Sequence, residues 1–134
     1  MLLLNPRRVS FGGASWERVT SVAIEPEAVR GITEWGDDGP HVVHADVPEQ
    51  RVTVTVTQEL LGEDMDTPTP GEQETLSFVT ARNSSGSRER AVSLIGVIQG
   101  VKYRVSKQSG SSRVIELIAV STDGSADPVD VSAV

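Results

Sequence analysis

The stretch RVTVTVTQE, residues 51–59, decides the fold class. Val and Thr alternate through it without interruption, and both branch at Cβ, which favours the pleated backbone of a strand. Because side chains alternate between the two sides of a strand, this period of two predicts one apolar and one hydroxylated face. The apolar face holds Val52, Val54 and Val56, and the other holds Arg51, Thr53, Thr55 and Thr57.

A second alternating run, ETLSFVTAR (residues 74–82), follows the acidic, proline-containing segment LLGEDMDTPTPGEQ. Leu76 and Phe78 fall on one side of this run, and Thr75, Ser77 and Val79 fall on the other. We therefore predict that the two runs form a hairpin joined by a long acidic loop.

The rest of the chain also reads as strands separated by turns. We expect strands near Arg8–Phe11, Arg18–Ile24 and residues 41–47, the last two stopping at Pro26 and Pro48. A weak helical spacing follows Pro26, and Trp35 falls in a predicted loop. A long run over residues 90–106 carries Gly96 and Gly100, which predict a bend or bulge, and RVIELIAVS (residues 113–121) returns beside it.

These elements predict an all-β fold, a mainly antiparallel β-sandwich or barrel-like domain with at most one short helix. We expect one domain over residues 1–134, with an N-terminal arm (about 1–7) and a C-terminal arm (about 122–134). The opening MLLLN is too short for a secretory leader or a membrane span, so we expect no membrane insertion.

Catalytic and metal chemistry finds little support in the sequence. The chain has no Cys, and its two His residues lie in HVVHAD, where His44 and Asp46 share a strand face but His41 does not. GEDMD (residues 62–66) lacks the spacing of a calcium loop. No Ser has the surroundings of a catalytic nucleophile, and no glycine-rich loop fits a phosphate. We expect no enzymatic activity and no cofactor.

Charge is divided into two blocks along the chain, although the total is −7. From Glu34 to Glu74 the only base, His aside, is Arg51, whereas from Arg82 to Arg113 the only acid is Glu89. Such blocks can attract each other between copies of the chain or between adjacent hairpins of one copy, and the sequence leaves both open. The net negative charge disfavours tight binding to a nucleic-acid backbone.

Long uninterrupted strands leave edge N–H and C=O groups that must be covered. Continuing the sheet into a neighbouring copy, so that a ring-forming β-barrel closes, removes those edges. In such a ring the hydroxylated face (Thr53, Thr55 and Thr57) is the candidate lumen face.

In overall plan the chain resembles the tail tube proteins of bacteriophages, which are related to the tube proteins of contractile injection systems. The resemblance covers most of residues 7–121 and lies in VTVTVTQELL…GEQETLSFVT and in VSLIGVIQGVKYRVS…RVIELIAVS. It implies a virion structural protein whose β-sandwich subunits, each with a flanking helix, form six-membered rings. The rings stack by self-assembly into a hollow conduit for DNA ejection. The segments that could supply the helix are residues 26–32 and 59–61.

The resemblance further implies assembly in the host cytoplasm, passing DNA that is not bound specifically, and sheath, baseplate hub and tail terminator proteins as partners. We predict contacts between stacked rings through an acidic and a basic group of residues. These are Glu59, Glu63, Asp64 and Asp66, and Arg82, Arg88 and Arg90. The alternatives are another tail or virion part (terminator, hub or decoration protein) and a monomeric β-sandwich binding module.

Overall fold

The computed structural model describes residues 2–4, 6–60, 68–80, 90–108 and 110–133, and these contain strands but no helix. The all-β prediction is confirmed. The helix that the resemblance implies near residues 26–32 or 59–61 is wrong for the described residues, because residues 26–32, 59 and 60 lie within strands; residue 61 lies outside the described part. The strands are β1 (Leu2–Leu4), β2 (Arg7–Phe11), β3 (Ala14–Ser15), β4 (Val19–Trp35), β5 (Val42–Leu60), β6 (Gln73–Val79), β7 (Arg90–Ser106), β8 (Gly110–Val120) and β9 (Val129–Ala133).

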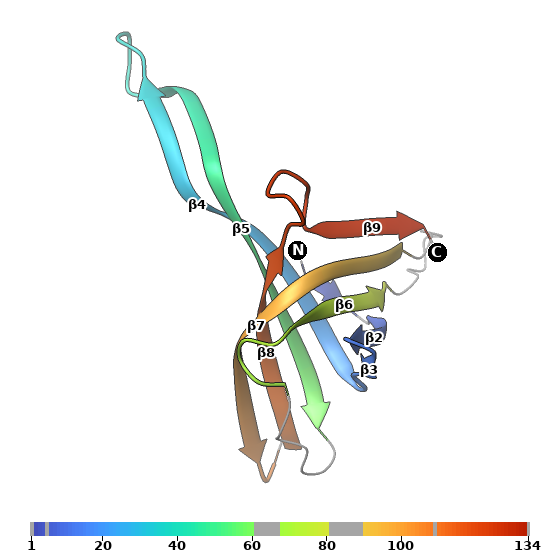
Figure 1. Ribbon diagram of the computed structural model, residues 1–134. Coiled ribbons are helices and arrows are strands. Elements are labelled where there is room, and N and C mark those ends of the chain that lie inside the picture. The colour runs from blue at the N-terminus through green and yellow to red at the C-terminus, as the bar shows by residue number, and fades with distance from the viewer. Residues whose placement is uncertain (1, 5, 61–67, 81–89, 109, 134) are drawn as a thin grey trace.

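All strand pairs are antiparallel, in the order β1-β4-β5-β8-β7-β6-β2-β3, with β9 paired to β7. The single sheet does not close into a barrel. In Figure 1, β4, β5 and β8 run roughly along the long axis of the molecule, while β6, β2 and β9 run across it. The sheet therefore folds back on itself as a sandwich-like body with an open end. The predicted terminal arms contain β1 and β9, which pair with β4 and β7.

Strand β7 belongs to both halves of the bent sheet. Its first part pairs with β6 and β9, and its second part pairs with β8. A register shift between Ile98 and Gly100 interrupts the β7–β8 pairing, as the glycines predict. Gly96 faces the core here, and a Cβ at this position would lie 2.9 Å from Leu117 Cδ2. The absence of a side chain at Gly96 therefore leaves the room that Leu117 occupies.

The hydrophobic core lies between the two halves of the sheet. Val54 and Val56 of β5 are fully buried, as the alternation predicts, together with Ile115 and Leu117 of β8. The facing half contributes Val9, Phe11, Leu76, Phe78, Val92, Leu94 and Ile98. The parts of the strands that line the core thus bury the one face that their period of two makes apolar.

Strands β5 and β6 do not form the hairpin predicted from residues 51–82. β5 pairs with β4 and β8, whereas β6 pairs with β7 and β2. Both strands bury one face in the same core, but they approach it from opposite halves of the sheet. A connection as long as residues 61–72 allows such a crossing, which a tight turn does not.

The prolines do not end β4 and β5, contrary to prediction. Pro26 lies opposite Val52, and β1 covers the other edge of β4 only at residues 21–23. Pro48 lies where the β4–β5 register shifts, beyond the part of β5 that pairs with β8. A proline without an N–H group is tolerated at such edge and bulge positions. The two strands therefore continue past both prolines to Trp35 and Val42.

A buried polar cluster holds the segment that precedes β4 against β5 and β8. The Arg113 side chain is 6% exposed, and its Nε donates to Gln58 Oε1 at 2.8 Å. Gln58 Nε2 donates to the Glu17 carbonyl at 2.7 Å, and the Arg113 guanidinium lies 5.8 Å from the centre of the Trp16 ring. Trp16 in turn stacks on Phe11. These contacts connect β2, β5 and β8 around one buried charge, in keeping with the rule that buried polar groups are hydrogen-bonded.

A short, self-bonded loop over residues 121–128 separates β8 from β9. Asp123 Oδ1 accepts backbone N–H bonds from Ala126 at 2.8 Å and from Ser125 at 2.9 Å. These two bonds, that from Ala126 first, lower the pKa of the Asp123 carboxyl from its usual value. β9 then continues along the same edge of β7 that β8 follows.

Candidate assembly surfaces

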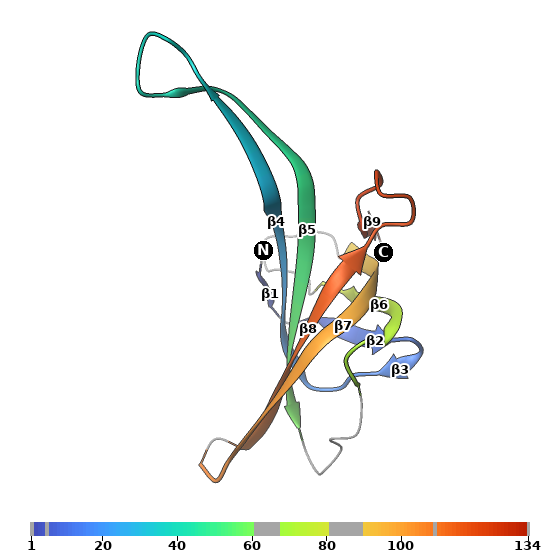
Figure 2. The same ribbon diagram turned by 60° about the vertical axis from the view of Figure 1, so that its left-hand side comes forward.

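The outer part of the β4–β5 hairpin, residues 27–51, projects from the body as a two-stranded arm (Figures 1 and 2). We call it the β4–β5 arm. All of its residues except Gly36 are exposed. In the described part of the chain, the pairing of β1 with β4 and the pairing of β8 with β5 both end before the arm begins. The arm therefore has two open edges and two solvent-facing sides.

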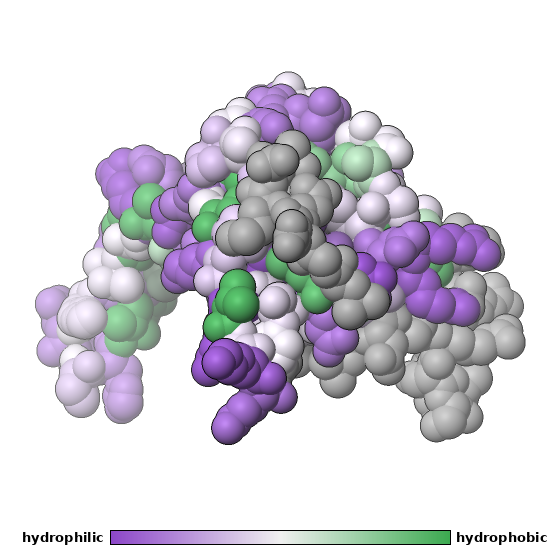
Figure 3. All heavy atoms as spheres, turned by 90° about the horizontal axis from the view of Figure 1, so that it is seen from below, coloured by the Kyte–Doolittle hydropathy of each residue, from purple (hydrophilic) through white to green (hydrophobic). Residues whose placement is uncertain are grey.

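Large hydrophobic side chains concentrate on the β4–β5 arm. It carries six of the nine exposed large hydrophobic residues of the described chain: Val29, Ile32, Trp35, Val42, Val43 and Val47. In Figure 3, hydrophobic patches interrupt the hydrophilic surface of the arm, seen faded at the left. A two-stranded hairpin by itself is at best marginally stable in water, and exposed apolar patches mark interaction sites. The arm therefore has the properties of a surface that another molecule covers.

Ion pairs support the arm only weakly. Glu27 Oε1 accepts from Arg51 Nη2 at 2.9 Å and from Nε at 3.2 Å, and Arg30 Nη1 lies 3.5 Å from Glu49 Oε1. Exposed pairs of this kind contribute roughly 0.2–1 kcal/mol each. Together with Glu17–Arg18, these are the ion pairs found among the described residues. None of them joins the acidic block to the basic block.

The predicted lumen residues Thr53, Thr55 and Thr57 do share the outer face of the sheet. All three are half-buried, and Thr55 lies between Ala23 of β4 and Glu116 of β8. The face is less polar than expected, because Thr53 and Thr57 are paired with Ile118 and Val114 of β8. Hydroxyl groups therefore form a stripe along β5 beside a partly apolar strand.

Two of the predicted ring-stacking residues lie in the described part of the chain, and they are far apart: Glu59 lies in β5 and Arg90 is the first residue of β7. Glu59 is paired with Ser112, which lies opposite Arg104, while Arg90 is paired with Ala133. Both side chains are exposed. The other residues of that prediction (Glu63, Asp64, Asp66, Arg82 and Arg88) lie outside the described residues.

The histidines lie near the end of the arm. His41 precedes β5, and His44 is paired with Glu34. Within residues 2–4, 6–60, 68–80, 90–108 and 110–133 there is no group of three His, Cys, Asp or Glu side chains placed to hold a metal ion. No helix long and apolar enough to cross a membrane occurs in the same part of the chain.

No protein-family model matches the chain, and a search of curated proteins finds none that is significantly similar. The candidate surfaces are therefore interpreted from their own geometry. The sequence pattern does not predict the arm, because prolines and glycines typical of loops interrupt it: Pro26, Gly31, Gly36, Gly39, Pro40 and Pro48. The signal that could have revealed it is the apolar content of residues 29–47, which is unusual for a solvent-facing loop.

Proposed function

We propose that the protein is a structural subunit that assembles with copies of itself into a hollow conduit, as in a phage tail tube built from stacked six-membered rings. The observation that carries the proposal is the β4–β5 arm, whose exposed apolar side chains and open edges require a partner. A neighbouring copy is the partner that a ring always supplies.

The open sheet supports the same proposal. In the described part of the chain the bent sheet does not close on itself, so its edges can be completed by the sheet of the next copy, and closure of a ring leaves no edge. The net charge of −7 suits the wall of a conduit for DNA, because an acidic wall does not retain phosphate groups. In this assembly the Thr53, Thr55 and Thr57 stripe faces the lumen.

The second candidate is another tail or virion part (terminator, hub or decoration protein), in which the exposed arm would contact a different virion protein. A monomeric β-sandwich binding module is the third candidate, and its carbohydrate-binding form is disfavoured because that form calls for a cluster of exposed aromatic rings. All five aromatic residues lie in the described chain, and among them Trp35 alone is exposed. Phe11, Trp16 and Phe78 are buried, and Tyr103 is half-buried.

A Thr55→Cys variant tests the lumen assignment, because the chain has no other Cys. In assemblies isolated by sedimentation, we expect the introduced thiol to react with a small maleimide and to be protected from a maleimide carried on a large polymer. An Asp127→Cys variant, altered at an exposed position, serves as the control and should react with both reagents. Equal labelling of the Thr55→Cys variant by both reagents would show that the Thr stripe faces the outside.

A further inference from the structure

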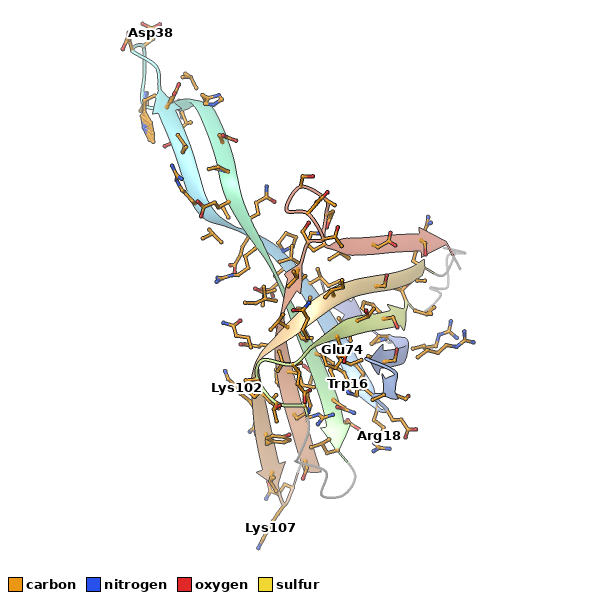
Figure 4. The ribbon with its side chains drawn as sticks, viewed as in Figure 1. Trp16, Arg18, Asp38, Glu74, Lys102 and Lys107 are labelled. Atoms are coloured by element: carbon orange, nitrogen blue, oxygen red, sulfur yellow. The ribbon has the colours of Figure 1, made fainter. Side chains whose placement is uncertain are left out.

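Two hairpins project from opposite ends of the subunit. One is the β4–β5 arm, and the other is the end of the β7–β8 hairpin, residues 99–112, which we call the β7–β8 tip. Figure 4 shows Asp38 at the end of the arm and Lys107 at the far end of the molecule. β5 runs from Val42 in the arm to Leu60, which is paired with Ser111 in the tip. At about 3.3 Å per residue, β5 spans roughly 60 Å from end to end, and the part between Arg51 at the base of the arm and Leu60 spans roughly 30 Å.

The arm is acidic. It contains six acids against Arg30 and Arg51, and both arginines are engaged by acids of the arm itself. The acids left for other interactions are Glu34, Asp37, Asp38 and Asp46, all exposed; Asp46 lies opposite Ile32 near the middle of the arm, and the other three lie beyond it.

The β7–β8 tip has the opposite charge. Its sequence contains Lys102, Arg104 and Lys107 and no acid. These three side chains are exposed, and Lys102 and Arg104 lie opposite Val114 and Ser112, which are uncharged. The tip also carries Val105, which is 74% exposed. Arm and tip together hold seven of the nine exposed large hydrophobic residues of the described chain.

Oppositely charged surfaces at opposite ends of one subunit cannot neutralise each other within that subunit. Even the nearest of these charges, Asp46 and Lys102, are roughly 35 Å apart along the sheet, because Lys102 lies level with Thr57 of β5, and this far exceeds the Debye length of about 8 Å at physiological salt. Two copies placed head to tail, however, bring an acidic arm against a basic tip and cover apolar side chains on both. We propose that the β4–β5 arm of one subunit binds the β7–β8 tip of a second copy of this chain.

This contact rests on the proposed self-assembly and specifies which surfaces meet. It is heterologous, because two different surfaces of the same chain are joined. Repetition of such a contact generates a closed ring, or an open filament where the rotation does not close. An interaction of the arm with a different protein leaves the basic tip without a role, whereas a second copy uses both.

Charge reversal tests the proposal with two variants. The arm variant carries Glu34→Lys, Asp37→Lys and Asp46→Lys, and the tip variant carries Lys102→Glu, Arg104→Glu and Lys107→Glu. Each variant alone places like charges in the contact, so we expect the concentration for half-assembly to rise at least about 100-fold. An equimolar mixture restores opposite charges at every contact and should assemble with alternating subunits. A matched control, Asp127→Lys with Asp130→Lys, should assemble like the wild type.

Sedimentation velocity on the wild type, both variants and their mixture distinguishes the outcomes. Assembly of either variant alone at the wild-type concentration overturns the arm–tip contact but leaves the proposed self-assembly of the wild type intact. A mixture of the two folded variants that stays monomeric leads to the same conclusion. A wild type that is monomeric at every concentration overturns both the contact and the proposed conduit.

Salt provides a second measurement that needs no substitution. Raising it to about 1 M shortens the Debye length to about 3 Å and should weaken wild-type assembly. Assembly that is unchanged or strengthened at that salt would contradict an electrostatic contact, even if a charge-reversed variant fails to fold.

Discussion

Replacing residues 28–50 by an Asn-Gly turn is expected to abolish self-assembly while the body of the subunit stays folded. Glu27 and Arg51 then become the last strand pair, and their ion pair is kept. Asn-Gly is the preferred two-residue connection for such a pair. Because nearly all of the removed residues are exposed, no core side chain is lost.

Sedimentation velocity and urea unfolding check this prediction together. The shortened protein should sediment as a single subunit and unfold cooperatively, with a midpoint close to that of the wild type. Shortening the 121–128 loop within its exposed residues 122–127 is the matched control and should leave assembly unchanged. Assembly that survives removal of the arm would show that the arm is not the surface through which copies meet.

Phe78→Ala is expected to lower the free energy of unfolding by about 3–5 kcal/mol, the usual range for a buried Phe truncated to Ala. Phe78 is 2% exposed and belongs to the cluster that joins the two halves of the sheet. A domain of this kind has a total stability of about 5–15 kcal/mol, so the loss is a large fraction of it.

Urea denaturation of Phe78→Ala beside Thr75→Ala separates core packing from strand propensity. Thr75 lies on the same strand with an exposed side chain, and its substitution should change stability by less than about 0.5 kcal/mol, as most surface changes do. Equal, small effects of the two substitutions would mean that β6 does not pack across the core from β5.

The alternation of residues 51–57 was enough to predict which side chains of β5 are buried. Val54 and Val56 are fully buried and the threonines are not, because a single apolar face must turn to the core. The extent of β7 and its bulge near Gly100 also followed from the sequence. These are local properties, determined by the alternation of side chains along a strand and by the conformational freedom of the glycine backbone.

Strand partners could not be predicted in the same way. The alternation of apolar and polar residues in β6 specifies which face is buried, but it does not specify which strand lies beside β6. The predicted β5–β6 hairpin is wrong for this reason, because β6 pairs with β7 and β2. The arm was missed because proline stops a strand only where its N–H group is needed, and at Pro26 and Pro48 the adjoining edges are open in the described chain. The charge blocks did indicate that acidic and basic residues are separated along the chain, but only the sheet topology places the acidic arm and the basic tip at opposite ends of the subunit.

Electron microscopy of the purified wild-type protein, concentrated at low salt, tests the central claim most directly. The account predicts hollow tubes or closed rings with six-fold symmetry, in which each arm reaches the neighbouring subunit. Dispersed particles of single-subunit size at every concentration and salt would contradict it, and the arm would then be a surface for a different partner.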